Sequence, residues 1–181
     1  MRSVVLTLMG LLAACASAQI LDQTSPYTNA SFNMDAPSLH WQQEVVAGLA
    51  GPLVQVDLYV TTPGSCTFNI WGTAPWNAGA PLWSTTFSSA VTGWVSVNTA
   101  GAGLNVTPGQ MFTLGFDGGG TGMWLGGSYQ PPSGGYLPGR PWLNGAYHTA
   151  GGEWDIAFRT YVPEPGALLL LGLGLVALRR R

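Results

Sequence analysis

Apolar and polar residues alternate with a period of two along the middle of the chain. The segment 53–61 reads LVQVDLYVT, so Val54, Val56, Leu58 and Val60 share one face and more polar residues share the other. This alternation is typical of a β-strand with one buried face. Similar runs predict strands at 39–46, 66–71, 82–87, 94–99, 111–116, 122–125 and 153–162.

Turn-forming residues separate these predicted strands. Gly, Pro, Asn or Ser occur in nearly every gap, and no stretch between the two ends has sustained helical periodicity. Many short strands at regular spacing favour an all-β fold, and we expect an antiparallel, jelly-roll-like β-sandwich over residues 34–162. Residues 19–33 are polar and turn-rich, which is compatible with a linker or an edge segment.

An apolar segment precedes this body. Arg2 stands before the apolar run 4–14, and the small residues Ala16 and Ala18 follow at positions that a signal peptidase accepts. We therefore expect a helical signal peptide over residues 1–18, cut before Gln19. The run is too short for a bilayer core of about 30 Å, which needs about 20 helical residues.

A second maturation route stays open at Cys15. The tetrapeptide Leu12-Ala13-Ala14-Cys15 resembles the lipobox of bacterial lipoproteins, in which the cysteine is lipidated. If the signal peptide is instead cut before Gln19, Cys66 is the only cysteine of the mature chain and has no partner for a disulfide. We expect Cys66 to be a buried thiol in a strand.

The other end of the sequence has a three-part pattern. Pro163-Glu164-Pro165 is followed by an apolar and glycine run over 166–178, and then by Arg179, Arg180 and Arg181. Proline fixes φ and disfavours helix in the residue before it, so the first part is a stiff, extended segment. The apolar run predicts a short membrane helix of roughly 20 Å, and the arginines keep their end cytoplasmic, so the body lies outside.

Residues 163–181 resemble the PEP-CTERM sorting signal of Gram-negative bacteria in all three parts. The resemblance implies recognition by an exosortase, with processing near Pro163, Glu164 and Pro165. It also implies a transient stay in the inner membrane and delivery to the cell surface or an exopolysaccharide matrix. The alternative is an ordinary tail anchor that follows a chance pair of prolines.

The body is similar to a group of bacterial extracellular β-sandwich domains. The likeness rests on residues 47–53 leading into 56–58, on residues 104–109 and on residues 154–161. It implies architecture and an accessory role, and it carries no catalytic residues.

Charged residues are scarce, at 8% of the chain, and lysine is absent. Between residues 19 and 162, seven acids face two arginines, Arg140 and Arg159, which gives a net charge of −5. A nucleic-acid backbone would be repelled, so we expect no nucleic-acid partner. Solubility then depends on neutral polar groups, as in secreted β-proteins.

Catalytic and cofactor motifs are missing from the sequence. There is no G-x-S-x-G, no H-E-x-x-H, no paired C-x-x-C and no P-loop, and the two histidines, His40 and His148, lie far apart. We therefore expect neither an enzyme nor a bound metal or cofactor.

Two carboxyl groups near the end of the body need separate attention. Glu153 and Asp155 are two residues apart, so on a strand they share a face at roughly 7 Å, a spacing that two glycosidase carboxylates can use. Their alternation with Trp154, Ile156 and Phe158 predicts instead a solvated outer face, with Asp155 paired to Arg159.

The eight tryptophans are the best functional lead, because aromatic rings stack on sugar faces. Four fall inside predicted strands and are expected in the core: Trp41, Trp71, Trp83 and Trp154. Six tryptophans and tyrosines lie in or beside Gly/Pro-rich loops: Trp76, Trp124, Tyr129, Tyr136, Trp142 and Tyr147. From these we select Trp76, Trp124, Tyr136 and Trp142 as candidate glycan-binding residues.

The sequence thus favours an exported, sorted protein of the surface or matrix that binds polysaccharide through loop aromatics. Signal peptidase, exosortase and exopolysaccharide are the expected partners. Two alternatives remain: a secreted hydrolase with an unrecognised active site, and a structural matrix protein that self-associates.

Overall fold

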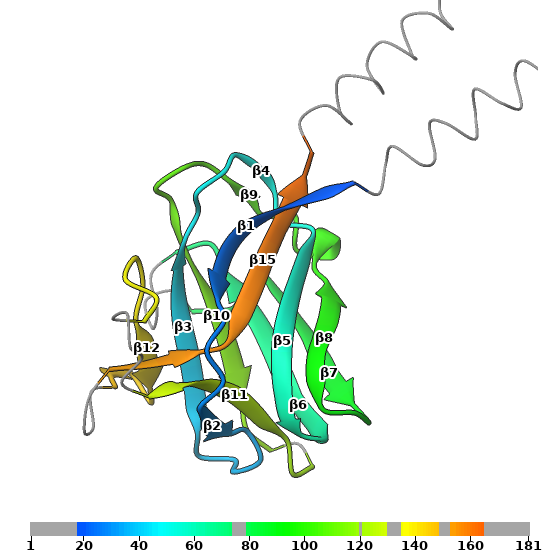
Figure 1. Cartoon of the computed structure of the whole chain (residues 1–181), viewed down its shortest axis with the longest axis vertical. Helices are drawn as coiled ribbons and strands as arrows, with labels where there is room; N and C mark the ends of the chain where they lie inside the picture. The colour runs from blue at the N-terminus through cyan, green and yellow to red at the C-terminus, as the bar shows by residue number, and fades with distance from the viewer. Residues whose placement is uncertain (1–17, 74–78, 120, 130–134, 149–152, 165–181) are drawn as a thin grey trace, which may run out of the picture.

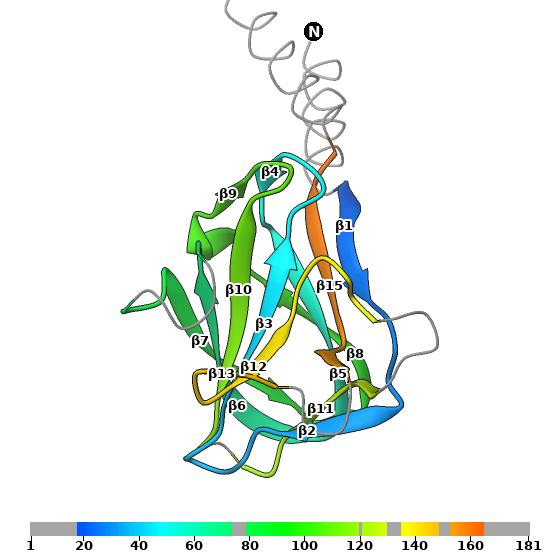
Figure 2. The same cartoon turned by 90° about the vertical axis from the view of Figure 1, so that its left-hand side faces the viewer.

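The alternating segments pair into two packed antiparallel sheets (Figures 1 and 2). The computed structural model describes residues 18–73, 79–119, 121–129, 135–148 and 153–164. The prediction of an all-β, antiparallel sandwich is confirmed, whereas its jelly-roll connectivity stays a prediction. Both predicted terminal helices lie outside the described residues.

The first sheet follows the order β1-β15-β5-β11-β14, with β8 paired to β5 and β2 paired to β11. Its strands are β1 (Gln19–Ser25), β2 (Ala30–Asn33), β5 (Gln55–Thr62), β8 (Gly93–Asn98), β11 (Trp124–Tyr129), β14 (Trp154–Ile156) and β15 (Phe158–Pro163).

The second sheet follows the order β13-β12-β3-β10-β6-β7. Its strands are β3 (His40–Val46), β6 (Gly64–Trp71), β7 (Trp83–Ser89), β10 (Met111–Asp117), β12 (Pro141–Leu143) and β13 (Ala146–Tyr147). A two-stranded ladder of β4 (Gly51–Pro52) and β9 (Asn105–Val106) and the 3-10 turn η1 (Ala100–Ala102) complete the elements.

The core lies between the inner faces of the two sheets. Val56, Leu58 and Val60 of β5 are fully buried, as the alternation predicts. On the opposite sheet the rings of Phe68 and Phe116 stack with their centroids 5.3 Å apart. Cys66 is buried and free, which confirms the prediction, and burial raises the pKa of its thiol to about 12.

The predicted strand over 153–162 is in fact two strands that run in different directions (Figure 1). Trp154 pairs with Tyr129 of β11, whereas Phe158 pairs with Leu58 of β5. Between them Ala157 donates its N–H to the carbonyl of Gly126, at 2.9 Å. The change of partner breaks the alternation, so Asp155 and the next three residues are all buried.

Residues 19–33 belong to the first sheet. β1 lies at its edge and pairs with β15, and the register shifts around Asp22 as at a β-bulge. The Oδ1 atom of Asp22 accepts the N–H groups of Gly48, at 2.8 Å, and Leu49, at 2.7 Å. The bulge therefore attaches the loop after β3 to the edge strand.

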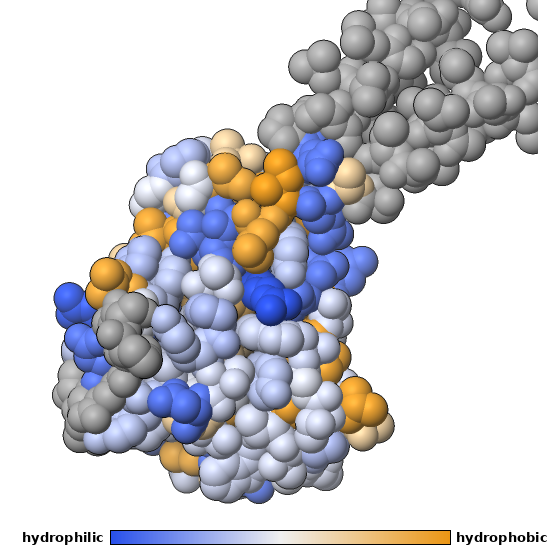
Figure 3. Space-filling model, viewed as in Figure 1, coloured by the Kyte–Doolittle hydropathy of each residue, from blue (hydrophilic) through white to orange (hydrophobic). Residues whose placement is uncertain are grey.

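The surface seen in Figure 3 is mostly pale, with scattered strongly hydrophilic groups and an apolar area beside β1 and β15. Leu21 of β1 and Leu49 are among the exposed large apolar residues. Among the described residues, no helix is long and apolar enough to cross a membrane.

Candidate functional site

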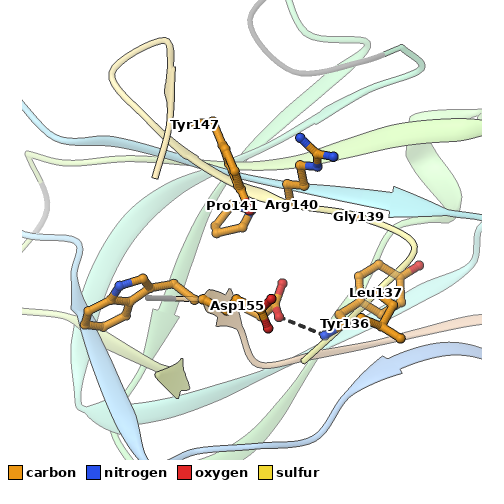
Figure 4. A pocket seen from close by; sticks show the side chains of 9 residues that line it. Tyr136, Leu137, Gly139, Arg140, Pro141, Tyr147 and Asp155 are labelled. Atoms are coloured by element: carbon orange, nitrogen blue, oxygen red, sulfur yellow. Dashed lines mark hydrogen bonds between the residues drawn. The ribbon is translucent and has the colours of Figure 1, made fainter. Parts of the chain in front are cut away.

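A pocket opens between the segment that contains β12 and the short strand β14 (Figure 4). Its volume is about 170 Å³. Aromatic rings, two carboxyl groups and one arginine meet there. The lining residues are Tyr136, Leu137, Gly139, Arg140, Pro141, Tyr147, Glu153, Trp154 and Asp155.

Asp155 forms the floor of this pocket and is only 4% exposed. Its Oδ2 accepts the N–H of Tyr136 at 2.8 Å, the bond drawn in Figure 4, and its Oδ1 accepts the Nε2–H of Gln43 at 3.2 Å. Burial raises the pKa of this carboxyl to about 6, and Glu153 adds to the rise, while the two hydrogen bonds oppose it.

This finding corrects the expectation for Asp155. The sequence predicted a solvated outer face and a pair with Arg159. Arg159 lies instead with its guanidinium carbon 3.9 Å from the centre of the Trp94 ring and opposite Asp57 on β5. The bend at Ala157 explains the difference, because the side chains before it no longer continue the inward and outward alternation of β15.

Tyr136 corrects a second expectation. It was selected as an exposed stacking ring, yet it is only 6% exposed and its ring packs edge-on against Phe158 at 5.0 Å. Its hydroxyl donates to Gln23 Oε1 and accepts the N–H of Val46, both at 3.0 Å. The ring therefore anchors the pocket wall and is not available for stacking on a ligand.

The opposite rim carries Arg140, whose guanidinium lies 5.0 Å from the centre of the Tyr147 ring. Tyr147 is 39% exposed, and the Trp142 ring lies 6.2 Å from it. Beneath the rim, Glu44 donates its N–H to the Arg140 carbonyl at 2.8 Å. Burial raises the pKa of the Glu44 carboxyl, and the nearby Trp142 and Arg140 side chains oppose this rise only in part.

Two glycines allow these close approaches. A side chain at Gly139 would collide with the carbonyl of Glu44, and one at Gly127 would collide with the carbonyl of Asp155 and the ring of Phe32. Both positions bring backbone against backbone next to the pocket, which only glycine permits.

An aromatic cluster supports the pocket from behind. Trp154 contacts Phe32 at 5.7 Å, Tyr129 at 4.5 Å and His148 at 5.5 Å. His148 also packs edge-on against Trp41 at 4.9 Å, and burial lowers the pKa of its imidazole. The cluster fixes Trp154, whose side chain stays partly exposed in the pocket wall.

The four residues selected for glycan binding therefore separate in space. Trp142 lies beside the pocket and Tyr136 lies within its wall. Trp124 is 37% exposed on β11 and does not line the pocket. Trp76 lies outside the described residues, as do Cys15, Ala16, Pro165 and Arg179, Arg180 and Arg181 of the maturation sites.

The tryptophans expected in the core also differ from one another in burial. Trp41 is buried, whereas Trp71, Trp83 and Trp154 are only partly buried. Trp71 pairs with Thr113 on the second sheet, and its ring lies over Gly115 of the same neighbouring strand. The glycine leaves room for this ring, which no strand pattern indicates.

Sequence reasoning missed Arg140 and the burial of Asp155. One signal for Arg140 was present, since it is one of only two arginines between residues 19 and 162.

His40 Nδ1 lies 2.8 Å from Asp117 Oδ1, and Asn69 donates to Asp117 Oδ2 at 2.7 Å. Within the described ranges, no group of three or more histidine, cysteine or acidic residues is arranged to hold a metal ion.

The fold and the pocket define an antiparallel β-sandwich protein with a small pocket of polar and aromatic residues. Its strand β15 ends at Pro163, where the Pro-Glu-Pro element begins. Residues 162–181 match the family model of the PEP-CTERM protein-sorting motif, so the chain carries a PEP-CTERM sorting motif. This confirms the resemblance and indicates export and sorting to the cell surface with exosortase processing. No curated protein matches the chain.

Proposed function

We propose that this protein is a non-enzymatic component of the bacterial surface or extracellular matrix whose body binds polysaccharide at the pocket. The sorting motif supports the location. The observation that carries the binding proposal is the meeting of Tyr147, Trp154 and Arg140 with two carboxyl groups in one hollow.

The chemistry of this hollow suits a sugar ring. The faces of Tyr147 and Trp154 offer stacking surfaces, each of which contributes about 1 kcal/mol in comparable ring contacts. Arg140 and Glu153 supply a donor and an acceptor for hydroxyl groups at the rim. A volume of about 170 Å³ is smaller than a drug-sized site, so the pocket fits a single unit of a polymer.

The test is a binding measurement with exopolysaccharide purified from the producing strain. We expect Arg140→Ala combined with Tyr147→Ala to weaken binding about tenfold or more, since it removes a stacked pair and a charged donor. Trp124→Ala is the matched control, because it removes an exposed ring outside the pocket and should leave binding unchanged. No binding by the wild type, or equal binding by the pocket variant, contradicts the proposal.

A secreted glycoside hydrolase is the second candidate, favoured by one specific observation. The pocket pairs Asp155, a carboxyl with a pKa raised to about 6, with the exposed Glu153, and glycosidases use such unequal carboxyl pairs. Both Asp155 oxygens already accept protein hydrogen bonds, which favours the binding role. Release of reducing ends from the same polysaccharide, abolished by Glu153→Gln, would establish the hydrolase instead.

A further inference from the structure

The two ends of the described body meet in one ladder. β1 begins at Gln19, the residue after the expected signal-peptide cut, and β15 ends at Pro163, the first residue of the Pro-Glu-Pro element. Gln19 and Pro163 are direct partners in this ladder. One step further, Glu164 donates its N–H to the carbonyl of Ala18 at 3.1 Å. Figures 1 and 2 show β1 and β15 side by side with these ends together.

This pairing is anchored along its length, so its end is not a loose contact. Ile20 pairs with Val162, which is 1% exposed, and the Gln23 N–H donates to Thr160 Oγ1 at 3.1 Å. At the far end Ser25, which is buried, pairs with Phe158. The ladder therefore holds the first residues of the sorting motif in place whenever β1 is docked.

A peptidase needs a substrate segment that is not already paired in a β-ladder. Proteins that grip an extended peptide use its backbone N–H and C=O groups, so a segment that is already paired must first open. The Glu164 N–H is occupied by Ala18, which is the last residue of the expected signal peptide. Hydrolysis of the Ala18–Gln19 bond consumes one water, leaves a carboxyl on Ala18 and an amino group on Gln19, and lets Ala18 depart.

We infer that removal of the signal peptide unlocks the sorting motif, so that exosortase processing follows signal-peptide cleavage. Cleavage takes away the carbonyl that holds the Glu164 N–H and leaves Gln19–Pro163 as the terminal pair, which frays readily. The inference rests on the proposed exosortase processing and names its regulation. It couples two maturation steps through one strand pair of the folded body.

The test follows both termini of the full chain over time in the producing bacterium, by mass spectrometry. Ala18→Tyr places a bulky residue where signal peptidase needs a small one, yet it keeps the backbone carbonyl. We expect the leader to stay attached and tail processing to slow about fivefold, the ratio that one hydrogen bond of ordinary net strength represents. Ala18→Ser is the matched control and should be processed like the wild type.

A second variant separates the ladder from other effects of a retained leader. Adding Ile20→Pro to Ala18→Tyr removes a ladder N–H and frays the end of β1, so tail processing should recover although the leader remains. Limited proteolysis verifies that this variant is folded. The inference is overturned if the wild type loses its tail first, if Ala18→Tyr is processed at the wild-type rate, or if Ile20→Pro restores nothing. If the wild type never loses its tail, the proposed exosortase processing is itself wrong.

Discussion

Two regions of the molecule are built by different means. One is the pocket, and the other is the seam, which we define as the β1–β15 pair of Gln19–Ser25 with Phe158–Pro163. The seam uses regular backbone pairing around one bulge, with apolar or hydroxyl side chains buried beneath it. The pocket uses one buried carboxyl group, Asp155, whose Oδ1 accepts the Nε2–H of Gln43 from the other sheet and whose Oδ2 accepts the N–H of Tyr136. The boundary between the two regions is Ala157, where the strand changes partner.

This difference shows where chemistry accumulates in a sheet protein. Regular pairing satisfies the backbone N–H and C=O groups locally. A break in the pairing turns side chains inward, and polar groups that end up there need partners from elsewhere. Burial raises the pKa of Asp155 at the bend to about 6, and in the seam it raises the pKa of Tyr161, whose hydroxyl donates to Asp57 Oδ2 at 2.7 Å.

The largest expected effect comes from Phe158, which belongs to the seam and packs on the pocket anchor Tyr136. Phe158 is 0% exposed, so Phe158→Ala should lower the free energy of unfolding by about 3–5 kcal/mol through lost burial and a cavity. Urea unfolding of the purified exported protein measures this. Val91→Ala, at a side chain that is 63% exposed, is the control and should change stability by less than about 0.5 kcal/mol.

The next largest effect is the pH dependence of stability, which distinguishes the pocket from the seam. Because the pKa of Asp155 rises from 3.8 unfolded to about 6 folded, the folded state binds the proton more tightly. Its stabilising contribution is full below pH 3.8 and is lost as pH rises through 6, at a cost on the order of 3 kcal/mol. Asp155→Asn should remove this contribution and leave the one from Glu44, whose pKa is also raised by burial. Parallel slopes in the two proteins between pH 4 and pH 7 would contradict the assignment.

The link between the two regions is the hydroxyl of Tyr136, which reaches Gln23 in the seam and Val46 behind the pocket. Tyr136→Phe leaves those groups without their partner and should destabilise the protein by about 1–2 kcal/mol. A double-mutant cycle with Gln23→Ala measures the coupling. Strict additivity of the two substitutions would show that seam and pocket are energetically independent.

The smallest effect is expected at the bulge in the seam. Asp22→Ala removes the acceptor for the N–H groups of Gly48 and Leu49, which are exposed to solvent, and should cost about 1 kcal/mol. Amide hydrogen exchange should accelerate at these two residues and stay unchanged around Asp155. Asp22→Asn keeps an acceptor oxygen and should lie between Asp22→Ala and the wild type.

Much of the architecture could be predicted from the sequence because strand alternation is a local signal. Each of the eight predicted strand segments overlaps with a strand of the structure, and the segment 153–162 overlaps with two. The strands that the pattern missed are short or polar, such as β1, β12 and β13. Pairing with neighbours stabilises these strands, and such pairing leaves little trace in composition.

The sequence by itself determined the two-sheet class of the body, the buried thiol at Cys66 and the sorting motif, predicted at residues 163–181 and matched at 162–181. These features depend on periodicity or on contiguous residues. Only the tertiary structure decided that Asp155 is buried, that Tyr136 is an anchor and that Ala18 meets Glu164. Those facts join residues far apart in the chain, and which distant partners meet is set by the bend at Ala157 and the pairing of β1, which no local pattern encodes.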